Sequence, residues 1–352
     1  MNRLTFTVFG LLLAVLLYVP ANAGTFTFTT LDDPLASTAN SQGTYASGIS
    51  GNNVVGWYEN SSGICGFLYN GSTYTTINDP SGANGTWAKA ISGTNIVGYY
   101  QDSSHIYHGF LYNGSTYTTL DDPLAGKGTY QGTQAFGIDG NNIVGSYDDS
   151  AGNSHGFLYN GSTYETLDGG LGSYTLPYGI SGNNIVGSYY DSSYISHVFL
   201  YNGSTYKTLN DPLGVNGTSA DGISGNNIAG GYFDSSYKFH GFLYDGSTFM
   251  TLDDPLPGEL GTDALGISGN NIVGYYYDSS YNAHGFIAAP TPEPSTFTLL
   301  GIGAIGLVGY GLRRRRLKKR TIAFLGQPTT PEEIPAILSF PSRSFEAKRR
   351  AA

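Results

Sequence analysis

Between residues 25 and 287, short runs of β-branched and aromatic residues alternate with tight turns that are rich in Gly, Asn and Ser. In one complete unit, residues 220–223 and 228–233 flank a Ser-Gly-Asn-Asn turn, and residues 240–244 and 248–252 flank an Asp-Gly-Ser turn. Gly and Asn tolerate a positive φ angle, and the flanking residues favour strands, so each pair of segments predicts a hairpin. The unit is therefore predicted to fold as a four-stranded antiparallel meander.

This unit recurs along the chain. The sequence Gly-Ile-Ser-Gly-Asn-Asn-Ile-Val-Gly, or a close variant, begins repeats 1 to 6 at Gly48, Ala90, Gly137, Gly179, Gly222 and Gly266. A second segment, typified by Gly-Phe-Leu-Tyr, follows each copy, with its phenylalanine at Phe67, Phe110, Phe157, Phe199, Phe242 and Phe286. Successive phenylalanines lie 43, 47, 42, 43 and 44 residues apart. This period fits one four-stranded propeller blade better than a leucine-rich or helical repeat, because the unit has no helical stretch.

The two ends of the repeat region complement each other. Repeat 6 stops after its third strand near Ile287, and Pro290 blocks further pairing. Residues 25–34 match the fourth-strand sequence of residues 115–123 almost position for position. We therefore predict an all-β fold, a six-bladed β-propeller of four-stranded antiparallel blades in which the N-terminal strand completes the last blade. An open β-solenoid is the alternative.

The first 23 residues have the features of a cleaved secretory signal. They contain a basic residue at Arg3, an apolar run over residues 6–18, and a small-residue site at 21–23. The predicted organisation is a signal peptide at 1–23, the repeat domain at 24–289, a sorting segment at 290–320 and a disordered tail at 321–352.

The sorting segment has three parts. Pro292, Glu293 and Pro294 precede an apolar stretch at 297–312, which predicts a short transmembrane helix, and a basic cluster begins with Arg313, Arg314, Arg315 and Arg316. Residues 292–320 resemble the PEP-CTERM sorting signal of Gram-negative envelope proteins. The resemblance implies Sec export, transient retention in the inner membrane and processing by an exosortase-type enzyme before display or release. An ordinary C-terminal anchor is the alternative.

The repeats themselves resemble the HAF family of probable extracellular repeats. The shared pattern is Gly-Ile, Val-Gly-Tyr-Tyr, Asp, His-Gly-Phe-Leu-Tyr and Thr-Leu-Asp, and it spans residues 25–287. This resemblance implies a surface or extracellular location and supplies no catalytic residues.

Charge and cysteine content narrow the possible partners. Residues 24–290 contain four lysines, no arginine and 22 acidic residues, a formal charge of −18. Nucleic-acid binding is disfavoured, because phosphate recognition needs clustered basic residues. Cys65 is the single cysteine of the sequence, so no internal disulfide can form.

Acidic and aromatic residues concentrate in the connections between strands two and three and between strand four and the next repeat, which we call the loop face. Its candidate ligand-binding residues are Tyr194, Tyr237, Tyr281, Trp87, Asp191, Asp234 and Asp278, and Tyr45, Tyr130 and Tyr174 are expected in the same loops. Aromatic rings beside carboxylates suit sugar binding, since rings cover apolar sugar faces and carboxylates accept hydroxyl hydrogen bonds. The alternative is that the tyrosines pack between blades and the carboxylates cap turns.

Five histidines recur at one repeat position, with Cys65 in repeat 1: His108, His155, His197, His240 and His284. A shared metal site is rejected, because radial symmetry keeps equivalent residues far apart. Each histidine is instead expected to bond the Asp six residues earlier, as in Asp278 and His284. No cofactor is predicted, although the Asp-Asp-Pro loops offer oxygen ligands that calcium accepts.

These observations favour a non-enzymatic exported protein of the cell surface or extracellular matrix that binds glycan, such as exopolysaccharide, or another envelope component. No catalytic residues are assigned, because no nucleophile elbow, phosphate loop or metalloprotease sequence is present. A propeller hydrolase or lyase that acts on exopolysaccharide is the alternative.

Overall fold

The computed structural model describes residues 26–37, 42–168, 173–256, 260–291, 303 and 305–316. The chain divides into two units, Met1–Thr291 and Pro292–Ala352. All the described strands belong to the first unit, and the described part of the second is helical at residues 305–316. The predicted signal peptide, the Pro292-Glu293-Pro294 sequence and the 321–352 tail lie outside the described residues.

The strands form antiparallel meanders that follow the repeats. Three sheets have four strands in sequence order. They are β2 (Thr44–Ser50), β3 (Asn53–Asn60), β4 (Gly63–Tyr69) and β5 (Tyr74–Ile77); β14 (Ser173–Ser181), β15 (Asn184–Tyr190), β16 (Ser196–Tyr201) and β17 (Tyr206–Thr208); and β18 (Thr218–Ser224), β19 (Asn227–Phe233), β20 (Phe239–Tyr244) and β21 (Phe249–Leu252).

Repeats 2 and 3 are joined in one eight-stranded sheet. Its strands are β6 (Thr86–Ser92), β7 (Asn95–Gln101), β8 (Tyr107–Tyr112), β9 (Tyr117–Leu120), β10 (Gly132–Asp139), β11 (Asn142–Asp148), β12 (Ser154–Tyr159) and β13 (Tyr164–Thr166). The two halves of this sheet are each an antiparallel meander, and they are connected through one parallel pair, Gly132 with Tyr107.

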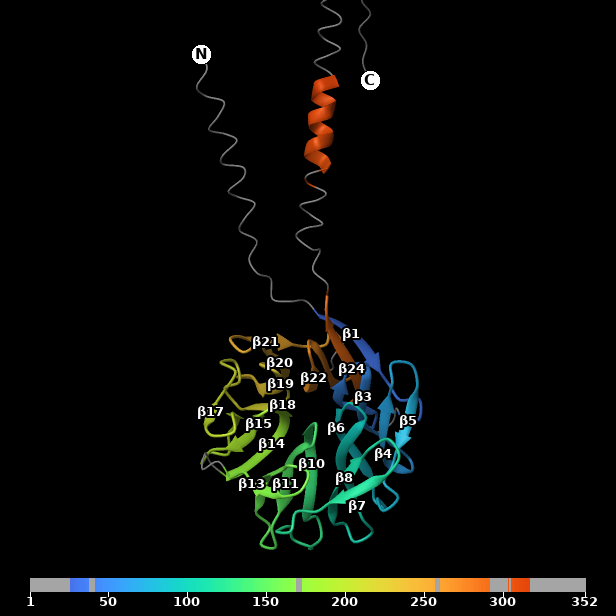
Figure 1. The fold of residues 1–352 in the computed structure, drawn as a ribbon, viewed down its shortest axis with the longest axis vertical. Coiled ribbons are helices and arrows are strands. Elements are labelled where there is room, and N and C mark those ends of the chain that lie inside the picture. The colour runs from blue at the N-terminus through green and yellow to red at the C-terminus, as the bar shows by residue number, and fades with distance from the viewer. Residues whose placement is uncertain are drawn as a thin grey trace, which may run out of the picture. The chain divides into compact units, whose positions relative to one another are not determined.

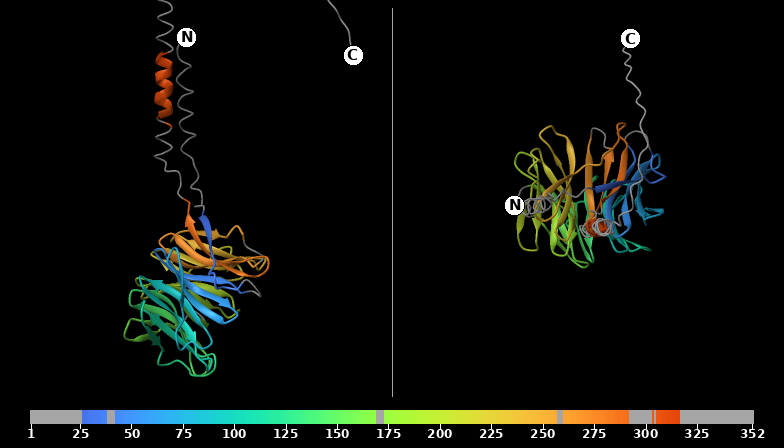
Figure 2. Two further views of the ribbon diagram at one scale, coloured as in Figure 1. Left: turned by 90° about the vertical axis from the view of Figure 1, so that its right-hand side faces the viewer. Right: turned by 90° about the horizontal axis from the view of Figure 1, so that it is seen from above.

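A fourth four-stranded sheet unites the two ends of the repeat region. It consists of β22 (Thr262–Ser268), β23 (Asn271–Tyr277), β24 (Ala283–Pro290) and the N-terminal strand β1 (Phe26–Leu31). β1 pairs antiparallel with β24 from Phe26 opposite Pro290 to Leu31 opposite Gly285. This is the closure that the sequence predicts. Figure 1 shows the sheets following one another around a central axis, and Figure 2 shows the same ring from two further sides.

Short turns connect the strands within each sheet. In the turn between β2 and β3, Ser50 pairs with Asn53 and Gly51 has a φ of 60°, a left-handed value that glycine adopts without strain. In the turn between β4 and β5, Asn70 Oδ1 accepts hydrogen bonds from the backbone N–H groups of Ser72 and Thr73. The predicted hairpins are therefore confirmed.

The core is a set of apolar clusters between successive repeats. The six repeated phenylalanines are completely buried. One cluster joins Val55 and Ile77 of repeat 1 to Ile96 and Phe110 of repeat 2. An equivalent cluster packs Leu31 of β1 and Val273 of β23 against Phe67 of repeat 1, so the last sheet contacts the first. Packing thus continues around the ring.

The repeated glycines lie where the innermost strands approach one another. A Cβ atom at Gly48 would lie 2.8 Å from Ala90 Cα, and one at Gly266 would lie 2.9 Å from Gly48 Cα. A side chain at Gly48 or Gly266 would force the strands apart, which explains why five of the six copies begin with glycine, whereas the copy in repeat 2 begins with Ala90. The β-propeller arrangement is confirmed, with four separate four-stranded sheets as blades.

Within the described residues, no helix combines the length and the apolar composition that crossing a bilayer requires. The predicted short transmembrane helix at 297–312 therefore finds no support there. The helical stretch at 305–316 ends in Arg313 to Arg316, four charged residues that are exposed.

Candidate functional site

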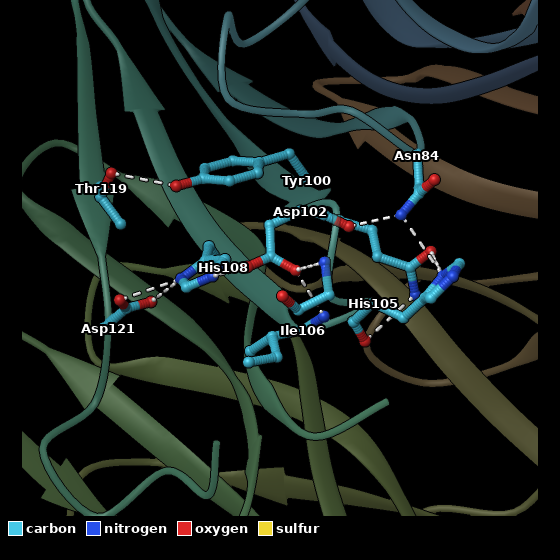
Figure 3. A network of polar contacts seen from close by, with 10 residues as sticks. Asn84, Tyr100, Asp102, His105, Ile106, His108, Thr119 and Asp121 are labelled. Atoms are coloured by element: carbon cyan, nitrogen blue, oxygen red, sulfur yellow. Dashed lines mark hydrogen bonds and ion pairs between the residues drawn. The ribbon is translucent and has the colours of Figure 1, made fainter. Parts of the chain in front are cut away.

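The histidine of repeat 2 is fixed between two carboxyl groups. His108 on β8 lies between Asp102, which follows β7, and Asp121, which follows β9 (Figure 3). Its Nε2 atom is 3.6 Å from Asp102 Oδ2, and its Nδ1 atom is 3.0 Å from Asp121 Oδ2. The ring stacks on Tyr100 with centroids 5.0 Å apart, and the Tyr100 hydroxyl lies 3.3 Å from Thr119 Oγ1. Two connections of the loop face are thereby tied to one side chain.

The same arrangement recurs in other repeats. His155 Nε2 lies 3.4 Å from Asp149, and its Nδ1 lies 3.0 Å from Asp168. For His240 the corresponding distances are 3.5 Å to Asp234 and 2.8 Å to Asp253. For His284 they are 3.4 Å to Asp278 and 2.9 Å to Asp32. At His197 the partners are Asp191, at 3.0 Å, and the amide of Asn210, at 2.7 Å. In repeat 1, Asn78 Nδ2 donates to Cys65 Sγ over 3.4 Å.

These contacts confirm the predicted bond to the Asp six residues earlier. Sequence reasoning missed the second partner, although its position also recurs in every repeat, as Asp32, Asp121, Asp168 and Asp253 in four of them and as Asn78 and Asn210 in the other two. In four repeats both ring nitrogens face carboxyl groups, and in His197 both are also engaged. The histidines therefore hold their own repeats together.

Asp191, Asp234 and Asp278 also shape the turns in which they lie. Asp191 Oδ1 accepts hydrogen bonds from the backbone N–H groups of Ser193 and Ile195, at 2.8 and 3.0 Å. The carboxyl groups of Asp234 and Asp278 make the same two bonds in their repeats. The structure thus favours the alternative in which these carboxylates cap turns.

Hydrogen bonding sets the pKa values of this network. Backbone and side-chain hydrogen bonds from Asn282 lower the pKa of Asp278 to about 2, and the hydrogen bond to His197 lowers that of Asp191. Burial alone would lower the pKa of His284, but the hydrogen bonds and charge interactions with Asp32 and Asp278 together outweigh it and raise the histidine pKa. The carboxylates are therefore ionised at neutral pH, which strengthens their hydrogen bonds.

The candidate tyrosines follow these aspartates at a strained position. Tyr194, Tyr237 and Tyr281 have φ angles of 60°, 61° and 66°, and their side chains are 78%, 74% and 44% exposed. They lie in connections between strands of three different sheets, and no ring contact joins them among the described residues. They do not pack between sheets, so they form separate exposed patches rather than one pocket.

The structure separates Trp87 from these tyrosines. Trp87 lies on the innermost strand β6 and stacks on Tyr99, with centroids 5.0 Å apart. Tyr45 is likewise on a strand, β2, and is 7% exposed. The prediction that both belong to the loop face is wrong, because β2 and β6 begin at Thr44 and Thr86, one residue earlier.

The paired carboxylates of the Asp-Asp-Pro loops have different partners. In residues 121–123, Asp121 faces His108, whereas Asp122 is buried and accepts a hydrogen bond from the Leu124 N–H. Burial raises the pKa of Asp122. Among the described residues, no three His, Cys, Asp or Glu side chains converge as metal ligands would. Calcium binding remains a prediction.

The comparison with protein families identifies the C-terminal segment. Residues 290–316 match the PEP-CTERM protein-sorting motif. This confirms the sorting signal, and it indicates an exported surface protein that an exosortase processes. The comparison with curated proteins found no match.

Several solved structures are similar to this chain. The Aleuria aurantia lectin in complex with alpha-methyl-L-fucoside has 17% identity and a TM-score of 0.44, over 77% of this chain and 97% of the lectin. TolB from Acinetobacter baumannii has 13% identity and a TM-score of 0.45, over 70% of this chain and 66% of TolB. The Trypanosoma rangeli sialidase in complex with sialic acid has 10% identity and a TM-score of 0.43, over 86% of this chain and 63% of the sialidase. Such distant likenesses carry no argument about a ligand.

Proposed function

We propose that this protein is a non-enzymatic component of the cell surface or extracellular matrix that binds glycan through the exposed tyrosines of the loop face. Export by the Sec route in a Gram-negative host would follow from the signal peptide at 1–23 and the sorting motif. The HAF-type assignment of the repeats is part of this proposal.

We also infer that the ring has six blades. The two halves of the eight-stranded sheet pack through an apolar cluster that includes Val97, Leu120 and Phe157, as separate neighbouring sheets do. One parallel pair, Gly132 with Tyr107, joins them. Counting each half as a blade gives one blade per repeat.

The strained tyrosines carry the proposal of glycan binding. Glycine occupies the equivalent left-handed position in repeat 3, at Gly152, with a φ of 85°. A side chain at such a position costs about 1 kcal/mol, so the local backbone favours glycine there. Repeats 4, 5 and 6 carry exposed Tyr194, Tyr237 and Tyr281 instead. A left-handed backbone that carries an exposed aromatic ring is best explained by contact of that ring with a ligand.

Sugar chemistry fits these rings. The exposed ring faces offer apolar surface to the C–H groups of a pyranose, and the carboxylates of Asp191, Asp234 and Asp278 in the same turns are ionised and partly exposed. Separate patches on different sheets suit a polymer that repeats, because several weak contacts on one chain add through effective concentration.

Polysaccharide retention tests this proposal. The chain from Gly24 onward is run through gels that contain the envelope polysaccharide of its host, with calcium or with a chelator. Substituting Tyr194, Tyr237 and Tyr281 together by Asn keeps a residue that tolerates positive φ but removes the rings. Retention should fall about tenfold, while the corresponding Tyr→Phe triple variant should keep it.

The matched control changes the opposite turns, where Ser72, Ser115 and Ser204 are each replaced by Ala. These variants should bind as the parent does. Full retention by a stably folded Asn triple variant would exclude the tyrosines. Loss of retention with chelator alone would instead assign the binding to calcium at the Asp-Asp-Pro loops.

A further inference from the structure

Two cavities of the repeat region differ in charge. The strand register shifts just before the repeated glycine, which leaves a bulge residue between two paired neighbours in each innermost strand. The bulge residues all line one axial cavity of about 70 Å³, and they are Ser47, Lys89, Phe136, Tyr178, Asp221 and Leu265. Lys89 and Asp221 carry opposite charges, so the lining of the axial cavity favours neither sign of ligand. A second cavity, between repeats 4 and 5, is lined by one sign of charge.

This second cavity, which we call the inter-repeat cavity, has a volume of about 220 Å³. Its apolar walls come from both repeats and consist of Leu200, Leu209, Ile223 and Ile228. Gly225 and Asn226 of the β18–β19 turn and Gly246 of the β20–β21 turn also line it, and these three residues are exposed. The cavity therefore opens at the turns opposite the loop face. A water molecule needs about 10–15 Å³ by this measure, so the cavity has room for a ligand of about a dozen non-hydrogen atoms.

Lys207 on β17 supplies the charge, and among the described lining residues it alone is charged. It pairs in register with Leu200. The same register position in repeats 1, 2, 3 and 5 is occupied by Thr75, Thr118, Glu165 and Met250. The repeat therefore does not require a lysine there. Every ion pair in the described part of the chain involves a histidine, so no carboxylate pairs with Lys207 within it. An unpaired ammonium beside apolar walls suits an anionic ligand.

Two side-chain amides line the same cavity. Asn184 and Asn226 make no side-chain hydrogen bond among the described residues. Between repeats 5 and 6, the counterpart of Asn184 is Asn227, whose Nδ2 donates to Gly269 O and Asn270 Oδ1, both at 3.3 Å. That amide ties two turns together, whereas the amides between repeats 4 and 5 are left to donate to and accept from the hydroxyl groups of a ligand.

Asp245 lies in sequence between two lining residues, Tyr244 and Gly246, but does not itself line the cavity. Its own turn holds its carboxylate. Asp245 Oδ1 accepts hydrogen bonds from the backbone N–H groups of Ser247 and Thr248, each at 2.8 Å, and Oδ2 accepts one from the Thr248 hydroxyl at 3.1 Å. The lining thus keeps the positive charge of Lys207.

We propose that the inter-repeat cavity binds one hexuronate unit, a sugar ring that carries a carboxylate at C6. Lys207 pairs with this carboxylate, and the amides of Asn184 and Asn226 bond to the ring hydroxyl groups. The apolar walls face the C–H groups of the ring. The choice of a sugar acid over another carboxylate rests on the proposed function. The site adds an acidic glycan as the ligand class and a second point of contact, on the face opposite the exposed tyrosines.

Three methyl glycosides that differ only at C6 test the proposal: the glucuronide, the glucoside and the 6-amino-6-deoxyglucoside. Ligand-observed NMR titration of the full-length chain at low ionic strength measures the dissociation constant of each. The glucuronide should bind about fivefold more tightly than the glucoside, and the amino glycoside should bind more weakly than either.

Variants that borrow residues from other repeats sharpen this test. Lys207→Met, with the residue of repeat 5, should abolish the preference for the glucuronide. Lys207→Glu, with the residue of repeat 3, should reverse it in favour of the amino glycoside. Asn226→Thr, with the residue that repeat 2 carries at Thr94, should weaken the binding of all three glycosides.

The matched control is Lys127→Met, which removes an exposed lysine that does not line the cavity. It should bind the glucuronide as the parent does, and so should the Asn triple variant of Tyr194, Tyr237 and Tyr281. Near-ultraviolet circular dichroism should confirm that every variant is folded. Equal binding of glucuronide and glucoside by the parent, no binding of any of the three, or an unchanged preference in the folded Lys207→Met variant would each overturn the proposal. Tyrosine-dependent polysaccharide retention would still support the loop-face proposal in those cases, so the two can fail separately.

Discussion

The histidine network and the axial cavity belong to the same repeats but follow opposite patterns. In the network, five repeats place a histidine against the Asp six residues earlier. In the cavity, the bulge position carries a different amino acid in every repeat. A contact within one repeat must be made again in each repeat. The axis is where all repeats meet, so one asymmetric set of side chains can come together there.

This difference separates residues that build the fold from residues that are free to take another role. The network residues should matter for stability, and the cavity residues should matter little or should even reduce it. Four experiments test this division.

The largest expected effect is on the closure of the ring. Deletion of residues 24–34 removes β1, with its pairing to β24 and the buried Leu31. Deletion exposes the edge of β24 and opens the apolar cluster around Phe67. The melting temperature should therefore fall by roughly 10 °C or more, or oligomers should form. Thermal melting and size-exclusion chromatography measure both results. An unchanged monomer with unchanged melting would contradict the closed ring.

The second test is the removal of the buried carboxyl group of Asp263. Burial raises the pKa of Asp263 to about 6 from its ordinary value of 3.8. Because this pKa is higher in the folded protein than in the unfolded chain, the protonated carboxyl group stabilises the fold fully below pH 3.8. That stabilisation is lost as the pH rises through 6, so at pH 8 the ionised carboxylate destabilises the folded protein. Asp263→Asn should therefore raise the free energy of unfolding by about 2–3 kcal/mol at pH 8. The groups that face Asp263 are Lys89, Asp221 and Tyr275.

Urea unfolding at pH 8 and at pH 4 measures this effect. The gain should be much smaller at pH 4, because the carboxyl group is then mostly protonated in the folded protein. A variant that is less stable than the parent at pH 8 would show that Asp263 supports the fold.

The third test removes one histidine from the network. His284→Gln loses the charged partner of Asp32 and Asp278, and the unfolding free energy should fall by about 1 kcal/mol. The histidine pKa is raised in the folded protein, so its contribution is present at low pH and is lost as pH rises through that pKa. The deficit should therefore be larger at pH 5.5 than at pH 8.5. Equal deficits at both values would exclude the ion-pair contribution.

The smallest expected effect concerns the strained turn. Tyr194→Gly relieves the left-handed backbone but gives the unfolded chain more freedom, so stability should change by less than about 1 kcal/mol. Differential scanning calorimetry should detect little change in melting temperature. A large loss would mean that Tyr194 packs in the fold, which would remove the argument that strain there serves a ligand.

Much of the fold could be predicted from local sequence. The Gly-Asn and Asn-Gly-Ser turns, the buried phenylalanines and the match of residues 25–34 to a fourth strand specified the hairpins, the repeat and the closure. The bond between Asp278 and His284 was also predictable, because both residues border one connection. The sorting motif at 290–316 is linear and needs no fold to be identified.

The sequence did not assign Tyr45 and Trp87 to innermost strands, because one residue at a strand boundary decides between loop and strand. Nor did it reveal that Lys89 and Asp221 line one cavity, since they lie in repeats 2 and 5, far apart along the chain. Repeat periodicity depends on backbone and turn chemistry, which are local. The meeting of unlike side chains depends on ring closure and on the bulges that aim them inward, and only the tertiary structure decides these.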